Sequence, residues 1–268
     1  MCRWAAWQGA PIFASEILTA PDHSLIQQSR DASECKTAIN ADGFGLAWYD
    51  KRPTPGLYRD VHPAWSDPNL KSLAEQVQAR LFMAHVRAST GTATSRNNCH
   101  PFVQDNWTFM HNGQVGGFEQ LRKAADMLIP DGLYPYRKGA TDSEALFLVA
   151  CGFGLERCAK TALEHAVAVF ETMARDIDCT PHMRMAAALS DGETLYAVRY
   201  ASDDRAPSLY YQWNAVWGGW SVVSEPYETA CGEWKEVPKG SFCRFTPRDV
   251  EITPFVPQVR AVVTKLVS

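Results

Sequence analysis

The second residue of the chain, Cys2, carries a thiol, and removal of Met1 would place a free α-amine on the same residue. An α-amine has a pKa of roughly 7.7–8.0, against about 10.4 for a lysine amine, so part of it is unprotonated near neutral pH. An N-terminal amine that accepts the proton of its own side chain can activate a nucleophile. Cys2 is therefore a candidate nucleophile, although a cysteine at this position is by itself more often inert.

An arginine follows an apolar run in the motif His85-Val86-Arg87-Ala88-Ser89-Thr90. A guanidinium at the end of a buried strand can hold a substrate carboxylate through two parallel hydrogen bonds. An ordinary salt bridge on an edge strand is the alternative, and the motif leaves it open. A further motif, Asn98-Cys99-His100-Pro101-Phe102, contains a His-Pro pair, which favours extended backbone before the proline.

The tripeptide His111-Asn112-Gly113 has two interpretations. Asn-Gly is the commonest two-residue hairpin turn, so the simpler interpretation is a turn. The functional alternative is an oxyanion hole, built from the side-chain amide of Asn112 and the backbone N–H of Gly113.

An acidic residue, Asp142, lies inside the capping-box motif Thr141-Asp142-Ser143-Glu144, which predicts the start of a helix. Acids in a first helical turn ordinarily complement the helix dipole. The functional alternative is a carboxylate that binds a substrate ammonium.

These motifs together describe one reaction. Cys2 would attack an amide carbonyl, and Asn112 and Gly113 would stabilise the oxyanion. Arg87 would bind an α-carboxylate and Asp142 an α-amine. A substrate with these two groups and a side-chain amide is glutamine or a γ-glutamyl amide.

The elements that must position these residues can be predicted from hydropathy patterns. Apolar runs predict strands at 43–49, 80–88 and 107–111, the last ending at Asn112-Gly113. The stretch 51–69 is rich in proline, aspartate and tryptophan, which predicts a long surface loop of the kind that often binds ligands. Helical spacing predicts helices at 116–127 and 155–177, besides the one that the capping box opens.

The last third of the chain returns to short strands. Two of them, at 183–189 and 194–200, flank Asp191-Gly192, which indicates a hairpin. The others are predicted at 210–213, 220–224, 242–245 and 250–252. Strands, then helices, then strands favour an α+β fold with packed sheets and outer helices, in a single domain over residues 1–268.

Composition excludes several classes of function. The net charge of −4, with acidic and basic residues mixed, gives no basic footprint for nucleic acid or a membrane surface. No apolar run reaches the roughly 18–20 residues of a membrane span, and no secretory signal is visible. The eight cysteines lack C-x-x-C or zinc-site spacing. We therefore expect free thiols in a reducing cytoplasm, with no metal and no cofactor.

The combination of motifs resembles the class II glutamine amidotransferases, which belong to the N-terminal nucleophile hydrolases. The resemblance implies a four-layer αββα sandwich of two antiparallel sheets and the site roles given above. It also implies substrate contacts for Thr90 and His111, with His100 either behind the residues that touch the substrate or purely structural. The matching pieces lie in the family's order within about the first 150 residues: Met1-Cys2-Arg3-Trp4, residues 40–45, the Arg87 strand, residues 98–102, 111–113 and 141–144.

The chain is most similar to the stand-alone members of that family, which include the γ-glutamyl hydrolase of ergothioneine biosynthesis and a fungal protein of glutathione breakdown. It departs from the larger synthase-linked enzymes at Ala88, where they usually carry an aromatic residue, and at Gly91. Smaller residues there leave room for a substrate larger than glutamine, with Trp65 of the 51–69 stretch as a candidate contact. Ser224-Glu225-Pro226 is shared with stand-alone members, and no chemistry follows from it.

Three functions are compatible with these observations. The first is an amidohydrolase that cleaves glutamine or a γ-glutamyl compound through a Cys2 thioester. The second is a glutaminase subunit that hands ammonia to a separate synthetase or acceptor protein. The third is a non-catalytic regulatory relic of the fold, although every expected catalytic position is filled.

Overall fold

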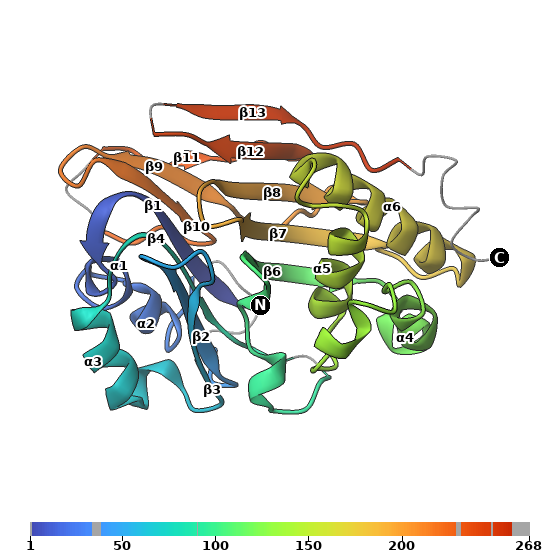
Figure 1. Ribbon diagram of the computed structural model, residues 1–268, viewed down its shortest axis with the longest axis horizontal. Coiled ribbons are helices and arrows are strands. Elements are labelled where there is room, and N and C mark those ends of the chain that lie inside the picture. Colours follow the sequence, from blue (N-terminus) through green and yellow to red (C-terminus); the bar gives the residue numbers. More distant parts are fainter. Residues whose placement is uncertain (1, 34–38, 90, 229–231, 248, 259–268) are drawn as a thin grey trace.

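The computed structural model describes residues 2–33, 39–89, 91–228, 232–247 and 249–258. Two antiparallel sheets pack face to face, and helices cover the outer face of each sheet (Figure 1). The order of layers is helix, sheet, sheet, helix, which confirms the predicted α+β sandwich. Three hydrophobic clusters fill the three spaces between these four layers.

The first sheet has seven strands in the order β11-β9-β10-β1-β4-β2-β3. The N-terminal strand β1 is central, because β10 and β4 pair with it on either side. Trp4 belongs to the cluster between the sheets and Trp7 to the cluster under the helices, so this strand is buried on both faces. The strands are β1 (Arg3–Phe13), β2 (Phe44–Tyr49), β3 (Gly56–Asp60), β4 (Gln78–Val86), β9 (Tyr210–Asn214), β10 (Gly219–Val223) and β11 (Lys235–Glu236).

The second sheet has six strands in the order β13-β12-β8-β7-β6-β5. The predicted hairpin at Asp191-Gly192 is confirmed, because β7 pairs with β8 from Ser190 opposite Leu195 onwards. The strands are β5 (Phe102–Gln104), β6 (Trp107–Val115), β7 (Met183–Ser190), β8 (Leu195–Ala201), β12 (Ser241–Phe245) and β13 (Val250–Pro254).

The helices divide between the two outer layers (Figure 1). Those on the first sheet are α1 (Ser15–Leu18), α2 (Leu25–Gln28) and α3 (Pro68–Gln76), and those on the second are α4 (Phe118–Asp126), α5 (Asp142–Gly152) and α6 (Ala159–Asp176). Short 3-10 turns occur at η1 (Ala64–Ser66), η2 (Arg96–Asn98) and η3 (Tyr134–Tyr136). Within the described ranges, no helix combines the length and the apolar character that crossing a membrane requires.

The prediction of a long surface loop at 51–69 is wrong. The stretch contains β3, which pairs with β2, followed by η1 and the first residues of α3. Asp67 caps α3 by accepting a hydrogen bond from the backbone N–H of Leu70 at 2.8 Å, and Pro68 occupies the first turn. The proline and aspartate that indicated a loop are the start signals of this helix. Trp65 packs against the cluster under the outer helices of the first sheet.

Two further boundaries differ from prediction. The strand predicted at 107–111 continues through Asn112-Gly113 to Val115, because residues 108–115 all pair with β7. The hairpin-turn interpretation of Asn112-Gly113 is therefore wrong. The helix predicted at 155–177 begins at Ala159, after a turn that follows α5.

Candidate active site

Cys2 immediately precedes β1 and is partly buried. Its Sγ lies 3.3 Å from the backbone nitrogen of Ala88 and 3.5 Å from the backbone oxygen of the same residue. Burial raises the pKa of the Cys2 thiol, while the Ala88 N–H and the positive charge of Arg87 act in the opposite direction. The thiol is thus protonated at neutral pH, so a base is needed before it can act as a nucleophile. Met1, whose removal was predicted, lies outside the described residues.

Asn112 lies on β6 and reaches across to the first sheet. Its Nδ2 donates a hydrogen bond to the backbone oxygen of Cys2, at 2.6 Å. The next residue, Gly113, has a φ of +145° and pairs with Met185 of β7. A β-carbon at Gly113 would lie 1.8 Å from the backbone oxygen of Arg184, so only glycine fits there. The two residues predicted to form the oxyanion hole are therefore consecutive on β6, and the first of them, Asn112, contacts Cys2.

Arg87 follows β4, with its side chain buried to 3 % exposure. The guanidinium donates to the backbone oxygen of Asp42 at 3.2 Å, to Ser89 Oγ at 3.0 Å and to Thr92 Oγ1 at 2.6 Å. Among the described residues, no carboxylate forms an ion pair with it. Among these residues, Arg87 therefore does not form the salt bridge that was the alternative interpretation. A buried cation without a counter-ion is costly, which makes this position suited to an anionic group of a ligand.

Asp142 begins α5 and lies at the end of β6. Its Oδ2 accepts a hydrogen bond from the backbone N–H of Val115 at 2.8 Å, and its Oδ1 accepts one from the N–H of Ser143 at 2.8 Å. The predicted cap is present, because Thr141 Oγ1 accepts from the Glu144 N–H at 3.2 Å. The carboxylate of Asp142 is thereby fixed to the backbone of Val115, which lies two residues after Gly113 on β6.

His111 lies on β6 with both ring nitrogens bonded to the protein. Nε2 lies 3.1 Å from the backbone oxygen of Arg184, which can only accept, and Nδ1 lies 2.9 Å from Ser143 Oγ. Burial lowers the pKa of His111, so the ring is neutral at neutral pH, with the proton on Nε2; Nδ1 faces the Ser143 hydroxyl, which also lies 3.2 Å from Asp142 Oδ1. His111 thus fixes the first turn of α5 beside Asp142, and neither nitrogen is left to contact a substrate.

His100 is buried between two other aromatic rings. Its ring centroid lies 4.3 Å from that of His85 and 4.5 Å from that of Phe102. Burial, together with the charge of Arg87, lowers the pKa of His85 to about 3, against a smaller opposing effect of the Asn112 side chain. Burial likewise holds the pKa of His100 well below its usual value. His100 therefore supports His85, which in turn lies among the candidate site residues.

Several other predicted features can be placed. Thr90, a predicted substrate contact, lies outside the described residues. Its neighbour Gly91 has a φ of +92°, and a β-carbon there would lie 3.3 Å from Glu119 Oε1. Trp65, a candidate substrate contact, packs on the outer side of the first sheet, as described above. The six described cysteines are free, while Cys35 and Cys231 lie outside the described residues.

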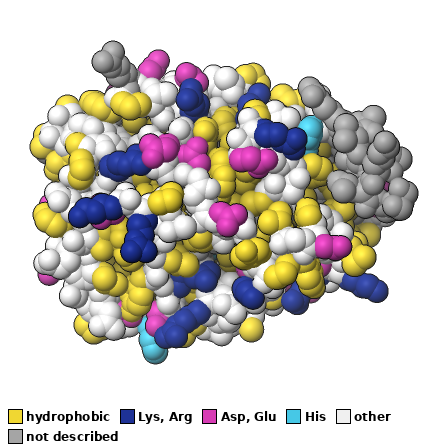
Figure 2. Space-filling model, in the orientation of Figure 1, with side chains coloured by type: hydrophobic (Ala, Val, Ile, Leu, Met, Phe, Trp, Pro, Cys, Tyr) yellow, Lys and Arg dark blue, Asp and Glu magenta, His cyan; other side chains and the backbone are white. Residues whose placement is uncertain are grey.

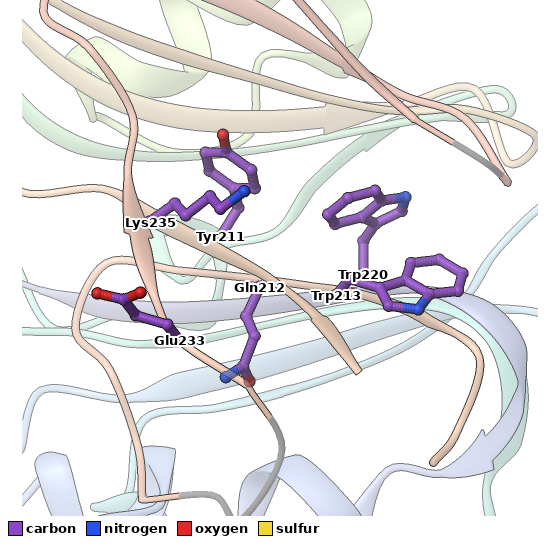
Figure 3. Close-up of a pocket in the computed structure, with 6 residues that line it drawn as sticks. All are labelled: Tyr211, Gln212, Trp213, Trp220, Glu233 and Lys235. Atoms are coloured by element: carbon purple, nitrogen blue, oxygen red, sulfur yellow. The ribbon is translucent and has the colours of Figure 1, made fainter. Parts of the chain in front are cut away.

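An aromatic-lined cavity on the first sheet lies away from these residues in the sequence. A cavity of about 210 Å³ lies along β9 and the short β11, lined by Tyr211, Gln212, Trp213, Trp220, Glu233 and Lys235 (Figure 3). None of the predicted site residues lines it. In the described part of the chain, no group of three or more His, Cys, Asp or Glu side chains is placed to hold a metal ion.

The surface is mixed in charge. On the face shown in Figure 2, lysine and arginine side chains are interspersed with acidic and hydrophobic ones. This agrees with the small net charge of −4.

Sequence reasoning missed the residues that hold the start of β1. Glu225 forms a buried ion pair with Arg3, which directly follows Cys2, at 3.0 Å between Oε2 and Nε. The motif Ser224-Glu225-Pro226 was visible, but nothing local connects it to a residue more than 220 positions away. It also missed Ser143, whose hydroxyl joins His111 to the first turn of α5.

Comparison with known proteins defines the class and then the family. The sandwich of two antiparallel sheets between helices is the fold of the N-terminal nucleophile hydrolases, and solved glutamine amidotransferases share it. A sequence profile described as "Glutamine amidotransferases class-II" matches residues 15–211, a range that begins after Cys2. The chain belongs to the class-II glutamine amidotransferases.

Three relatives illustrate the range of this family. The probable glutamine amidotransferase DUG3 of Saccharomyces cerevisiae is 31% identical over 96% of this chain and 85% of its own. The gamma-glutamyl-hercynylcysteine sulfoxide hydrolase of Mycolicibacterium smegmatis is 26% identical over 95% of this chain and 100% of its own. A solved glutamine aminotransferase class-II domain protein from Silicibacter pomeroyi is 47% identical, with a TM-score of 0.79, over 96% of this chain and 100% of its own.

More distant structures share the fold alone. The glutamine phosphoribosylpyrophosphate amidotransferase of B. subtilis superposes with a TM-score of 0.61 at 14% identity. The superposed region is 96% of this chain and 50% of that enzyme's chain.

Proposed function

We propose that this protein is an amidohydrolase that cleaves the side-chain amide of glutamine or of a γ-glutamyl compound through a thioester on Cys2. The proposal requires removal of Met1, so that the α-amine of Cys2 is free to accept the thiol proton. We also propose that residues 1–268 form one domain. The protein would work in the cytoplasm, where a reducing environment keeps an N-terminal thiol reduced.

The observation that carries the proposal is the environment of Arg87. This buried guanidinium has no carboxylate partner among the described residues, and the next residue, Ala88, is the one that contacts the thiol of Cys2. A carboxylate bound at Arg87 would neutralise the buried charge and bring the rest of the ligand to the nucleophile. The α-carboxylate of a glutamyl group supplies such a charge.

The second charged group of a glutamyl substrate is its α-ammonium, and Asp142 is suited to bind it. Each carboxylate oxygen of Asp142 already accepts one backbone N–H bond, from Val115 and from Ser143. A carboxylate has about four acceptor sites, so capacity for an ammonium remains. The two backbone bonds also fix the orientation of the side chain, which favours strict recognition.

The reaction follows from these positions. The α-amine of Cys2 takes the thiol proton, and the thiolate attacks the amide carbon, forming a tetrahedral intermediate whose oxyanion is held by Asn112 and Gly113. The C–N bond then breaks, and the leaving nitrogen takes the proton from the α-ammonium, which gives ammonia or an amine and a thioester. Water, deprotonated by the same amine, attacks the thioester and releases the glutamyl carboxylate and the thiol.

Two classes of substrate fit these positions: glutamine and a larger γ-glutamyl amide. The names of the relatives cover both a glutamine amidotransferase and a hydrolase of a γ-glutamyl sulfoxide. Ala88, which contacts the thiol, has only a methyl side chain, and Gly91, three residues further along, has none. We therefore propose that the glutamyl end is read strictly and the leaving group loosely.

The proposal is tested by competition and by trapping. Glutamine, γ-glutamyl-cysteine derivatives and γ-glutamyl anilides compete for the enzyme, and intact mass after rapid quenching shows whether a glutamyl group is attached. The Cys2→Ala variant should lose hydrolysis and the mass adduct but still bind substrate. Turnover of this variant within tenfold of wild type would exclude the assignment. Reaction of glutamine alone, with ammonia release that depends on an added partner, would instead favour a glutaminase subunit.

A further inference from the structure

The start of β1 is held by the two residues that follow β10 in the sequence, Ser224 and Glu225. The pairing register between β1 and β10 begins at Ala5 opposite Val223, and Arg3 and Trp4 lie beyond it at the start of β1. Ser224 and Glu225 take over there. The backbone N–H of Trp4 donates to Ser224 Oγ at 2.9 Å, and the N–H of Ser224 donates to the Trp4 oxygen at 3.0 Å.

Glu225 binds the residue that follows Cys2. Its Oε2 lies 3.0 Å from Arg3 Nε, and both side chains are at most 3 % exposed. Arg3 Nη1 also lies 3.4 Å from the backbone oxygen of Ser224. The ion pair is therefore fully withdrawn from water and has only a small range of positions available to it.

Glu225 is itself fixed by a third segment of the chain. Its Oε1 accepts hydrogen bonds from His23 Nε2 at 2.5 Å and from the backbone N–H of Ser33 at 2.8 Å. Gln28 Nε2 donates to the Glu225 backbone oxygen at 3.1 Å. The carboxylate thus connects the helical layer around α2 to the N-terminal end of β1.

An N-terminal nucleophile needs such an anchor more than an internal one. With the α-amine of Cys2 free, as the proposed function requires, the nucleophile is a chain terminus, and termini are ordered only where contacts hold them. Cys2 is then positioned by Asn112 on one side and by Arg3 and Trp4 on the other. An error of about 1 Å at a reacting group can cost on the order of 10²-fold in rate.

We propose that Glu225 is a positioning residue for Cys2 and acts through its ion pair with Arg3. This inference rests on the proposed function, because it assigns Glu225 to the chemical step of Cys2. Arg87 and Asp142, which would bind the substrate, belong to other segments and are independent of Glu225. Loss of the ion pair should therefore slow the chemical step and leave substrate binding nearly unchanged.

The test compares Glu225→Gln with wild type and with Glu171→Gln. Glu171 is a matched control, since it is buried on α6 and accepts a hydrogen bond from Tyr200 Oη at 2.8 Å, away from Cys2. For Glu225→Gln, we expect kcat on a γ-glutamyl anilide to fall by about 10- to 100-fold, with KM within about twofold of wild type. Each rate is divided by the concentration of active sites, which is measured by titration with a glutamine-derived electrophile. Unfolded protein therefore does not lower the reported kcat.

Unchanged kcat per titrated site in Glu225→Gln would overturn the proposal, as would a loss matched by Glu171→Gln. If Glu225→Gln does not fold, Glu225→Asp replaces it. This variant keeps the charge but shortens the side chain by one methylene, and we expect a smaller fall in kcat with the same KM. A folded Glu225→Asp with wild-type kcat would equally overturn the proposal.

A second readout separates this inference from the proposed function. Alkylation of Cys2 by iodoacetamide, followed by the mass of the N-terminal peptide, reports the reactivity of the thiol without any substrate. If wild type hydrolyses no γ-glutamyl amide, the proposed function fails. Slower alkylation of Cys2 in Glu225→Gln than in wild type and Glu171→Gln would still support the positioning role, and equal rates would reject it.

Discussion

The side-chain nitrogen Nδ2 of Asn112 lies 2.6 Å from the backbone oxygen of Cys2, so one amide hydrogen bond joins β6 of the second sheet to the start of β1 in the first. A carboxamide has two N–H donors. One holds Cys2. In the proposed mechanism the second would stabilise the oxyanion that forms when the thiol attacks, so a single side chain would both position Cys2 and stabilise the transition state.

Asn112→Ala should lower kcat by about 10²–10³-fold, the cost typical of losing one oxyanion donor. KM should change little, because the charge that Asn112 stabilises develops only in the transition state. Steady-state kinetics on a γ-glutamyl anilide measure both constants. Asn106→Ala is the control, since Asn106 also donates from Nδ2 to a backbone oxygen, that of Asp191 at 2.8 Å. A folded Asn112→Ala enzyme with wild-type kcat would leave Asn112 only a structural role.

The same residue shows where sequence-based prediction of the fold succeeds and fails. The Asp191-Gly192 hairpin was predictable, because its flanking strands pair with each other and the signal is local. Asn112-Gly113 carries an equally strong local turn signal, yet lies inside β6. Pairing with β7, some 70 residues away in sequence, overrides the local preference. Tertiary pairing of this kind leaves no trace in the dipeptide itself.

The candidate site was predictable where a motif carries its own chemistry. Arg87 and Asp142 were predicted as site residues from a charged residue at the end of an apolar run and from a capping box, and the structure confirms the cap at Thr141 and the buried position of Arg87. The anchoring of Cys2 was not, because Arg3 and Glu225 are separated by almost the whole chain and either residue alone suggests a surface charge. His111 was assigned to the substrate from its place in a motif, whereas its two ring nitrogens bond to Ser143 and the Arg184 backbone.

Arg87→Lys should raise KM for γ-glutamyl substrates by about ten- to a hundredfold, since one hydrogen bond to a charged group contributes about 1.5–3 kcal/mol. Lysine keeps the charge but cannot form the bidentate pair or keep all three bonds to Asp42, Ser89 and Thr92. The rate at saturating substrate should fall less. Arg80→Lys, on the same strand β4 but in an exposed ion pair with Glu193, serves as the control. Equal KM values for both variants would move the carboxylate-binding site elsewhere.

Asp142→Asn should weaken binding of substrates that carry an α-ammonium, because it removes the charge while an amide oxygen can still accept from Val115. We expect an analogue without the α-amine to bind poorly to wild type and no worse to the variant. Inhibition constants for a matched pair of glutamate analogues, with and without the amine, measure this selectivity. The control is Asp126→Asn, which alters a carboxylate on α4 that pairs with Arg137. This variant should keep wild-type selectivity. If Asp142→Asn also keeps it, the ammonium is bound by another group.

The two buried, neighbouring imidazole rings of His85 and His100 should make the protein sensitive to acid. Burial lowers the pKa of His85 to about 3 and that of His100 well below its usual value, so both are neutral in the fold. In the unfolded chain a histidine has a pKa of about 6.5. The unfolded state therefore binds more protons below that pH, and stability falls as the pH drops from about 6.5 towards the folded-state pKa values.

His100→Phe should reduce this acid sensitivity, because phenylalanine keeps an aromatic ring against His85 and Phe102 and takes up no proton. Free energies of unfolding from urea titrations at pH 7.5, 6.5, 5.5 and 4.5 measure the effect. Relative to wild type, the variant should gain up to about 1.4 kcal/mol per pH unit below pH 6, the slope for one proton. His62→Asn, at an exposed histidine, should follow wild type. Parallel pH profiles for His100→Phe and wild type would show that His100 is already protonated in the fold, contrary to its buried position.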